Sequence, residues 1–263
     1  MSRHPGLGLP DRIQACLFDV DGVLTETATV HAAAWKEMFD AFLRARSDRS
    51  GETFVAFDEV GDYDRFVDGL PREDGTRSFL ASRGIDLPEG SPDDSPGAGT
   101  IHGLGNAKNA LVLRKIGEDG VEAYPGSVRY VEAVCAVGLR RAVVSSSANC
   151  EAILRAAGIA GLFEVRVDAT TIARDHLAGK PAPDTFLAAA SALGVPADRA
   201  VVFEDALSGV DAGRAGRFGF VVGVDRVGQA EALRAHGADV VVTDLAELLD
   251  DEARSGGTPS QRD

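Results

Sequence analysis

Short apolar runs recur along the chain, and several of them end in polar or acidic residues. Such runs are typical of buried strands, which we expect at residues 14–18, 141–145, 200–204, 218–224 and 239–242. Helical patterns lie between them, at residues 127–137, 150–157, 185–193 and 207–215. The alternation predicts an α/β fold, a Rossmann-like parallel sheet with helices on both faces and ligands bound outside the carboxyl ends of its strands.

The stretch from about residue 28 to residue 122 interrupts this alternation, because no strand of matching character occurs there. Its first part carries one apolar stripe at intervals of four residues: Val30, Ala34, Met38 and Phe42. Further helices are expected at residues 72–83 and 106–116. The intervening residues 86–105 are rich in Gly, Pro, Ser and Asp and predict a long loop. We therefore expect an inserted helical cap domain.

The domain boundaries follow from these patterns. We expect residues 1–27 and 123–250 to form the core and residues 28–122 the cap, with two crossings near residues 25 and 124 that act as a double hinge. The first dozen residues are expected to be a loose arm, and residues 251–263 a disordered tail.

Charge and cysteine content exclude several classes of partner. The 41 Asp and Glu exceed the 27 Lys and Arg by 14, and this negative field repels nucleic acid and anionic membrane surfaces. No CxxC pair occurs among Cys16, Cys135 and Cys150, and no apolar run approaches the ~20 residues that span a bilayer. We expect a cytoplasmic protein that is a monomer or a weak homo-oligomer.

Two carboxylates follow the first expected strand. Asp19 and Asp21 are two residues apart, so an extended backbone places both on one side, where two like charges need a cation. Alone, the Asp-x-Asp-Gly sequence that ends at Gly22 fits an ordinary turn equally well.

Further polar residues end other strands or open helices, and they favour chemistry over a turn. Ser145 follows the second strand, Lys180 lies in a Gly-Lys-Pro segment, and Glu204 with Asp205 ends the third strand. At one sheet edge these groups would suit Mg²⁺, which prefers oxygen ligands, and a phosphoryl group, whose charge must be neutralised.

These motifs resemble those of the haloacid dehalogenase superfamily of phosphotransferases. Four motifs match in order: Asp19 with Asp21, Ser145, Lys180, and Glu204 with Asp205. The resemblance implies that Asp19 attacks phosphorus and that Asp21 is the general acid and base. It also implies Mg²⁺ held by Asp19, by the backbone carbonyl of Asp21 and by Asp205, with Glu204 acting through water. Ser145 would bind a phosphoryl oxygen, and Lys180 would balance its charge.

The cap sequence resembles that of β-phosphoglucomutases within this superfamily. The matching Thr27 and His31 would lie beside Asp21, and with Trp35 they share one helical face. The segment from Gly69 through Asp74 resembles the loop whose arginine, here Arg72, clamps the phosphate that is not being transferred. Lys108 with Asn109 resembles a second cap site that reaches the cleft. By themselves, His31, Arg72 and Lys108 are also compatible with ordinary residues on cap helices.

A further phosphate contact is expected from Ser147 and Asn149, which precede a helix. They resemble a Ser-Lys-Asn site of the mutases, but here Ala148 replaces the lysine. The loop at residues 86–105 has no counterpart in the mutase pattern.

The resemblance implies an isomerase that interconverts β-D-glucose 1-phosphate and glucose 6-phosphate through an aspartyl phosphate and a bisphosphate. The alternative is a Mg²⁺-dependent sugar-phosphate phosphatase of the same superfamily, in which water accepts the phosphoryl group. A binding or regulatory protein on a former enzyme scaffold is disfavoured, because every charged motif residue is present.

Overall fold

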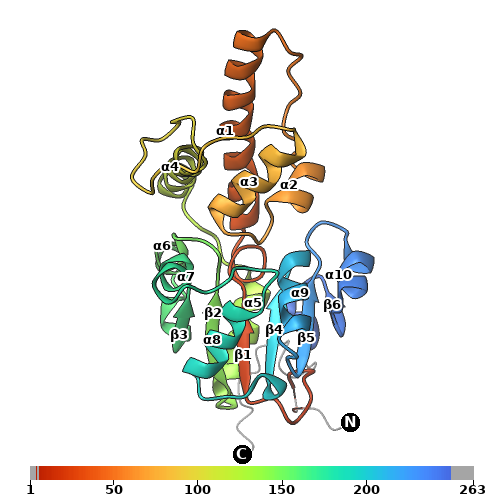
Figure 1. Cartoon of the computed structure of the whole chain (residues 1–263). Helices are drawn as coiled ribbons and strands as arrows, with labels where there is room; N and C mark the ends of the chain where they lie inside the picture. The colour runs from red at the N-terminus through yellow and green to blue at the C-terminus, as the bar shows by residue number, and fades with distance from the viewer. Residues whose placement is uncertain (1–3, 5, 250–263) are drawn as a thin grey trace, which may run out of the picture.

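The core of the protein is a six-stranded sheet in which neighbouring strands run parallel. The computed structural model describes residue 4 and residues 6–249, so the expected tail at 251–263 lies outside the described residues. The strand order is β3-β2-β1-β4-β5-β6 (Figure 1). The strands are β1 (Ala15–Phe18), β2 (Arg140–Val144), β3 (Val165–Val167), β4 (Ala200–Glu204), β5 (Phe220–Val224) and β6 (Val240–Val242).

Helices cover both faces of the sheet. On one face lie α5 (Pro125–Ala136) and α6 (Cys150–Ala156), and on the other α8 (Asp184–Ala192) and α9 (Leu207–Ala215). Side chains of β1 alternate between the two layers, since Cys16 and Phe18 join the first and Ala15 and Leu17 the second. Three-residue β3 and the short helices α7 (Ala169–Asp175) and α10 (Ala230–His236) were not expected. The sheet itself agrees with the predicted fold class, which is confirmed.

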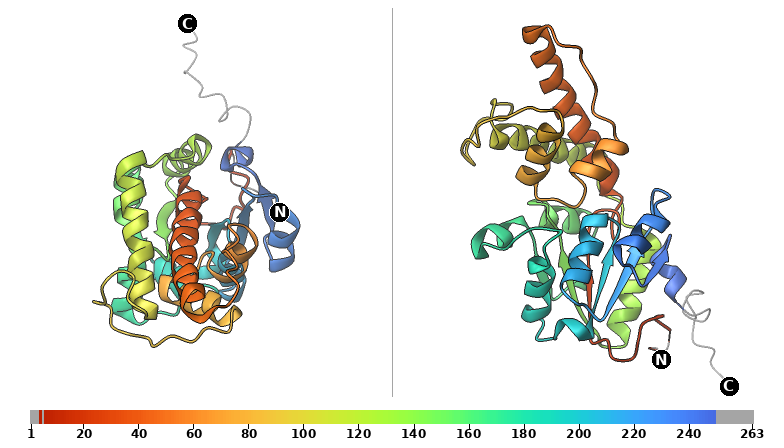
Figure 2. Two further views of the ribbon diagram at one scale, coloured as in Figure 1. Left: turned by 90° about the horizontal axis from the view of Figure 1, so that it is seen from above. Right: turned by 45° about the vertical axis from the view of Figure 1, so that its right-hand side comes forward.

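Four helices form a separate cap beyond the carboxyl ends of the strands (Figure 1). They are α1 (Thr27–Ser50), α2 (Gly61–Phe66), α3 (Arg72–Ser82) and α4 (Ile101–Asp119). The cap has its own aromatic core, in which Phe39 packs against Phe79 at 4.2 Å and Trp35 at 5.2 Å between ring centroids. The right-hand view of Figure 2 shows the same separation of cap and core.

Two chain segments connect cap and core, and they lie side by side. The Tyr124 amide donates to the Leu24 carbonyl at 2.9 Å, and the Glu26 amide donates to the Glu122 carbonyl at 3.0 Å. The crossings expected near residues 25 and 124 therefore meet as a pair of backbone strands. The domain boundaries drawn from the sequence stay a prediction.

The prediction of a loop over residues 86–105 is wrong for its last five residues, because α4 begins at Ile101. The Thr100 hydroxyl caps this helix by accepting from the Gly103 amide, and Ile101 and Leu104 are buried in the cap core. Glycine at 103 indicates close packing rather than a loop, because a Cβ there would lie 2.5 Å from the Ala98 carbonyl oxygen.

The prediction that the first dozen residues form a loose arm is also wrong for the part of that segment that the structure describes. Leu7 and Leu9 are buried in the main core, and the Tyr130 hydroxyl donates to the Leu7 carbonyl at 3.0 Å. No helix within residue 4 and residues 6–249 combines the length and the apolar character needed to cross a membrane.

Candidate active site

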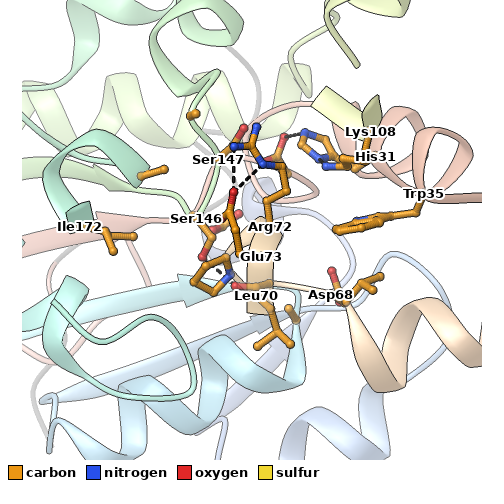
Figure 3. A pocket seen from close by; sticks show the side chains of 18 of the residues that line it. His31, Trp35, Asp68, Leu70, Arg72, Glu73, Lys108, Ser146, Ser147 and Ile172 are labelled. Carbon is orange, nitrogen blue, oxygen red and sulfur yellow. Dashed lines mark hydrogen bonds and ion pairs between the residues drawn. The ribbon is translucent and has the colours of Figure 1, made fainter. Parts of the chain in front are cut away.

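A cavity of about 200 Å³ lies between the cap and the carboxyl ends of the strands (Figure 3). It is lined by nine of the predicted site residues: Asp19, Asp21, His31, Gly69, Arg72, Lys108, Ser147, Glu204 and Asp205. Four others, Thr27, Ser145, Asn149 and Lys180, are buried next to it. The cap thus closes over the sheet edge to which the sequence assigned the chemistry.

Lys180 joins two carboxylates at the floor of this cavity. Its ammonium donates to Asp19 Oδ1 and to Glu204 Oε1, both at 2.5 Å, and its side chain is only 1% exposed. Burial raises the pKa of Asp19 to about 6 and that of Glu204 to about 7, while Lys180 opposes both shifts. Burial lowers the pKa of Lys180, but its two partners outweigh this and raise it above its usual value. One lysine therefore holds the Asp19 side chain in place but leaves the site short of positive charge.

Asp21 is held by residues from the first cap helix. The Thr27 hydroxyl donates to Asp21 Oδ1, and His31 Nε2 lies 3.5 Å from the same oxygen. On the other side of the imidazole, Lys108 Nζ and His31 Nδ1 are 2.7 Å apart. Burial, followed by the charge of Lys108, holds the pKa of His31 well below its usual value, so the ring is neutral and accepts from Lys108 through Nδ1.

Burial raises the pKa of Asp21, against the hydrogen bond from Thr27 and the charge of Lys108. A carboxyl with a raised pKa can hold a proton and release it to a neighbouring oxygen, which suits a general acid and base. Burial also lowers the pKa of Lys108 to about 7. Asp21, His31 and Lys108 therefore lie one after another, and His31 connects the candidate acid Asp21 to α4 of the cap.

Oxygen atoms on the other side of Asp19 suit a hard divalent cation. Gly22 adopts φ +85°, and a Cβ there would lie 1.8 Å from Asp205 Oδ2, so glycine lets the loop that carries Asp21 approach this carboxylate. Burial, then Asp68, Glu204 and Asp19, raises the pKa of Asp205 well above its usual value, which marks unneutralised negative charge. Within the described residues no three His, Cys, Asp or Glu side chains could hold a metal by themselves. A cation would thus combine carboxylates with a backbone carbonyl and outside oxygen ligands.

The cap supplies cations to the opposite wall. Arg72 begins α3 and Lys108 lies on α4, with its ammonium 4.9 Å from the centre of the Trp35 ring. Gly69 precedes α3 with φ +69°, and its carbonyl accepts from the Ser146 hydroxyl at 2.7 Å. A Cβ at Gly69 would lie 2.3 Å from Ser208 Oγ, so glycine permits this close contact between cap and core.

The loop after β2 faces the cap. Ser145 Oγ accepts from the backbone amide of Ser147 at 3.1 Å. The side-chain Nδ2 of Asn149 donates to Asn109 Oδ1 of α4 at 2.8 Å. Ala148 lies in the cavity wall together with residues of the unexpected helix α7: Ala169, Ile172 and Ala173. This wall is apolar where the mutase pattern has a lysine.

Sequence reasoning missed several residues of the cavity, among them Tyr63, Asp68 and Ser146. It gave no role to Glu73 and Asn109, which lie in the segments that resemble the mutase cap. Burial, followed by Glu204, Asp64 and Asp19, raises the pKa of Asp68 to about 8, and Tyr63 hydrogen-bonds to it. Asp68 adjoins Gly69, and Ser146 adjoins Ser147, so reading those two motifs one residue further would have included them. Tyr63 belongs to none of the motifs, so the sequence gave no signal for it.

The comparisons with known proteins agree with this geometry. A sequence model of the haloacid dehalogenase-like hydrolase family matches residues 13–217. The β-phosphoglucomutase of Mycobacterium bovis is 58% identical over 246 residues, which cover 92% of this chain and 94% of that protein. The β-phosphoglucomutase of Bacillus subtilis is 32% identical over 237 residues, 90% of this chain and 92% of that protein.

A solved structure of CbbY from Rhodobacter sphaeroides in complex with phosphate matches with a TM-score of 0.66. It is 27% identical, and the match covers 92% of this chain and 99% of that chain. Sequence and fold therefore lead to one assignment: the chain belongs to the haloacid dehalogenase-like hydrolase family.

Proposed function

We propose that this chain is a β-phosphoglucomutase, an isomerase that interconverts β-D-glucose 1-phosphate and glucose 6-phosphate. The observation that carries the proposal is one cavity with groups for two phosphates, Asp19 and Lys180 on the core side and Arg72 with Lys108 on the cap side. A bisphosphate intermediate needs both sites at once. The relatives from Mycobacterium bovis and Bacillus subtilis bear this activity in their names.

In this mechanism the Asp19 carboxylate attacks the phosphorus and forms an aspartyl phosphate, while Lys180 neutralises part of the charge. Asp21, held by Thr27, gives a proton to the departing sugar oxygen and takes one from the sugar hydroxyl that accepts the phosphoryl group. Ser145, Ser147 and Asn149 are proposed to bind phosphate oxygens. The cap cations Arg72 and Lys108 then hold the phosphate that is not reacting.

The family implies a metal cofactor, and we propose Mg²⁺ held by Asp19, the Asp21 carbonyl and Asp205. When bound, it supplies positive charge that lets an anionic nucleophile approach an anionic phosphate. Glu204 accepts from Lys180 and from the Ala206 amide, at 2.5 and 2.8 Å, so its role here is to position the lysine, with any metal contact made through water.

The direct test incubates the protein with β-D-glucose 1-phosphate, Mg²⁺ and a trace of glucose 1,6-bisphosphate, and follows both glucose 6-phosphate and free phosphate. A mutase forms glucose 6-phosphate with little free phosphate. The alternative, a sugar-phosphate phosphatase, would release phosphate in proportion to the substrate consumed. That outcome would overturn the proposal but leave the roles of Asp19 and Asp21 intact.

Arg72 separates these two activities. Arg72→Ala is expected to lower mutase kcat/KM roughly ten- to a hundredfold, because a charge-assisted hydrogen bond is worth about 1.5–3 kcal/mol. Hydrolysis of acetyl phosphate should stay within a few-fold, since this small substrate offers the cap no second phosphate. Steady-state kinetics on both substrates measure the difference.

The matched control for this variant is Arg114→Ala, which removes an exposed arginine of the cap that pairs with Glu37 and does not line the cavity. It should leave both reactions unchanged. Equal losses of Arg72→Ala on the two substrates would show that Arg72 supports the fold or closure of the cap instead.

Mg²⁺ is expected to stabilise the folded protein, because it neutralises the crowded carboxylates. At one hundred times its Kd a ligand adds about 2.7 kcal/mol, or roughly 5–10 °C in Tm for a chain of this size. Thermal unfolding with Mg²⁺ and with chelator measures the shift. Asp205→Asn should reduce it and the exposed Asp198→Asn should keep it; equal shifts in both variants would contradict the assigned site.

A further inference from the structure

Arg72, the proposed clamp for the distal phosphate, is already paired with its neighbour. Its Nε donates to Glu73 Oε1 at 2.9 Å, and its Nη2 forms an ion pair with the same oxygen at 2.8 Å. Both side chains line the cavity, about a quarter exposed, and Figure 3 shows them side by side. A phosphate that enters the clamp therefore meets a guanidinium with a counter-ion in place and a carboxylate that repels it.

An unused hydrogen-bonding group lies on the far side of that carboxylate. His102 is in the first turn of α4, and its buried Nδ1 has no hydrogen-bond partner among the residues that the structure describes. This nitrogen is 3.7 Å from Glu73 Oε1, too long for a hydrogen bond. The other ring nitrogen faces Glu89, at 3.9 Å, and Asp94 is a further acidic neighbour.

Resting on the mutase function proposed above, we infer that Glu73 is an exchangeable counter-ion, paired with Arg72 in the free enzyme and transferred to His102 when the distal phosphate binds. The transfer needs Glu73 Oε1 to approach His102 Nδ1 by about 1 Å to reach hydrogen-bond distance. The transfer frees Nε and Nη2 of Arg72 to bind the phosphate. It also moves a negative charge away from the incoming dianion.

Such a device suits a reaction in which the clamp must release its phosphate in every cycle. The bisphosphate has to turn around, so each of its phosphates occupies the cap site in turn. A clamp without a counter-ion would hold the intermediate more tightly and slow this turn, since binding the ground state more strongly does not speed the reaction. Glu73 and His102 are thus positioning residues that set how firmly Arg72 holds phosphate.

A double-mutant cycle tests the exchange. Calorimetry measures the Kd of glucose 6-phosphate for the full-length protein in Mg²⁺ and beryllofluoride, which occupies the phosphoryl site on Asp19. Glu73→Gln is expected to tighten binding roughly two- to fivefold, the range for a partly exposed ion pair. His102→Leu is expected to weaken it roughly two- to tenfold, the range for one hydrogen bond, because Glu73 then has nowhere to move.

The double variant is decisive. If His102 acts through Glu73, His102→Leu has no effect in the Glu73→Gln background, and His102→Gln, which keeps a donor, binds within about twofold of the parent. The same weakening by His102→Leu in both backgrounds would show a merely structural role and overturn the inference. Weaker or unchanged binding by Glu73→Gln would overturn it as well.

A spectroscopic readout follows the histidine directly. The imidazole nitrogen signals of the five histidines are recorded by NMR with and without glucose 6-phosphate, and His102 is assigned by its absence from the His102→Gln spectrum. Its Nδ1 signal should shift on ligand binding in the parent and stay unshifted in Glu73→Gln. A shift of equal size in both proteins would contradict the exchange.

Failure of the proposed function gives a different result. If the parent binds glucose 6-phosphate no better than inorganic phosphate, the sugar assignment fails. The cycle is then run with inorganic phosphate in the same buffer, where beryllofluoride leaves only the cap for it. The same pattern among the variants supports the exchange, and its absence overturns it.

Discussion

Asp19→Asn is expected to abolish mutase turnover, because an amide cannot form the phosphoryl bond that a carboxylate forms. Replacing one carboxylate oxygen of Asp19 by an amide nitrogen should not unfold the protein, because Lys180 keeps Glu204 as a partner at 2.5 Å. No other carboxylate follows β1 in the position of Asp19. Asp19→Ala should be equally inactive.

The measurement is steady-state turnover of β-D-glucose 1-phosphate, with thermal unfolding to show that the variant is folded. Asp48→Asn, an exposed residue of α1, is the matched control and should keep full activity. Substantial activity in pure Asp19→Ala protein would mean that another group attacks the phosphorus.

Asp21→Asn is expected to lower kcat by about 10²–10⁴, the usual contribution of general acid and base catalysis. Cation binding should persist, because the proposed contact comes from the backbone carbonyl. The variant should still be phosphorylated by acetyl phosphate, whose leaving acetate needs no proton. Its phosphorylation by a sugar phosphate, whose alkoxide does need one, should be slowed by the same factor as kcat.

Mass spectrometry of the intact protein after each phosphate donor distinguishes these steps, since the aspartyl phosphate adds the mass of one phosphoryl group. Equal phosphorylation by both donors would reject Asp21 as the acid. Retained Mg²⁺ binding, measured by calorimetry, keeps this result separate from a lost metal site.

The position of the motif residues at one sheet edge could be predicted from the sequence, because each residue is tied to a strong local pattern. Asp19 and Glu204 stand at the ends of apolar runs that are buried on both faces as β1 and β4, and parallel pairing sets Phe18 beside Phe203. Strand ends that are in register bring their next residues together. The fold class and the core of the site therefore followed from local patterns and the topology that they imply.

The tertiary structure alone decided the contacts that depend on residues far apart in the chain. Val165–Val167 is too short to predict a strand, and it pairs only because β2 offers an open edge. Gly103 and Gly105 of α4 look like loop residues in the sequence, but in the structure Ala98 and Arg72 pack against them.

The charge relations within the cavity have the same origin. Asp68 faces Glu204 across the closed cap, and Glu73 lies between Arg72 and His102 because α3 and α4 pack together. Hydrophobic periodicity acts over a few residues and sets the elements and the strand ends. Which charges meet, and which stay unpaired, depends on how cap and core close on each other, and only the folded chain determines that.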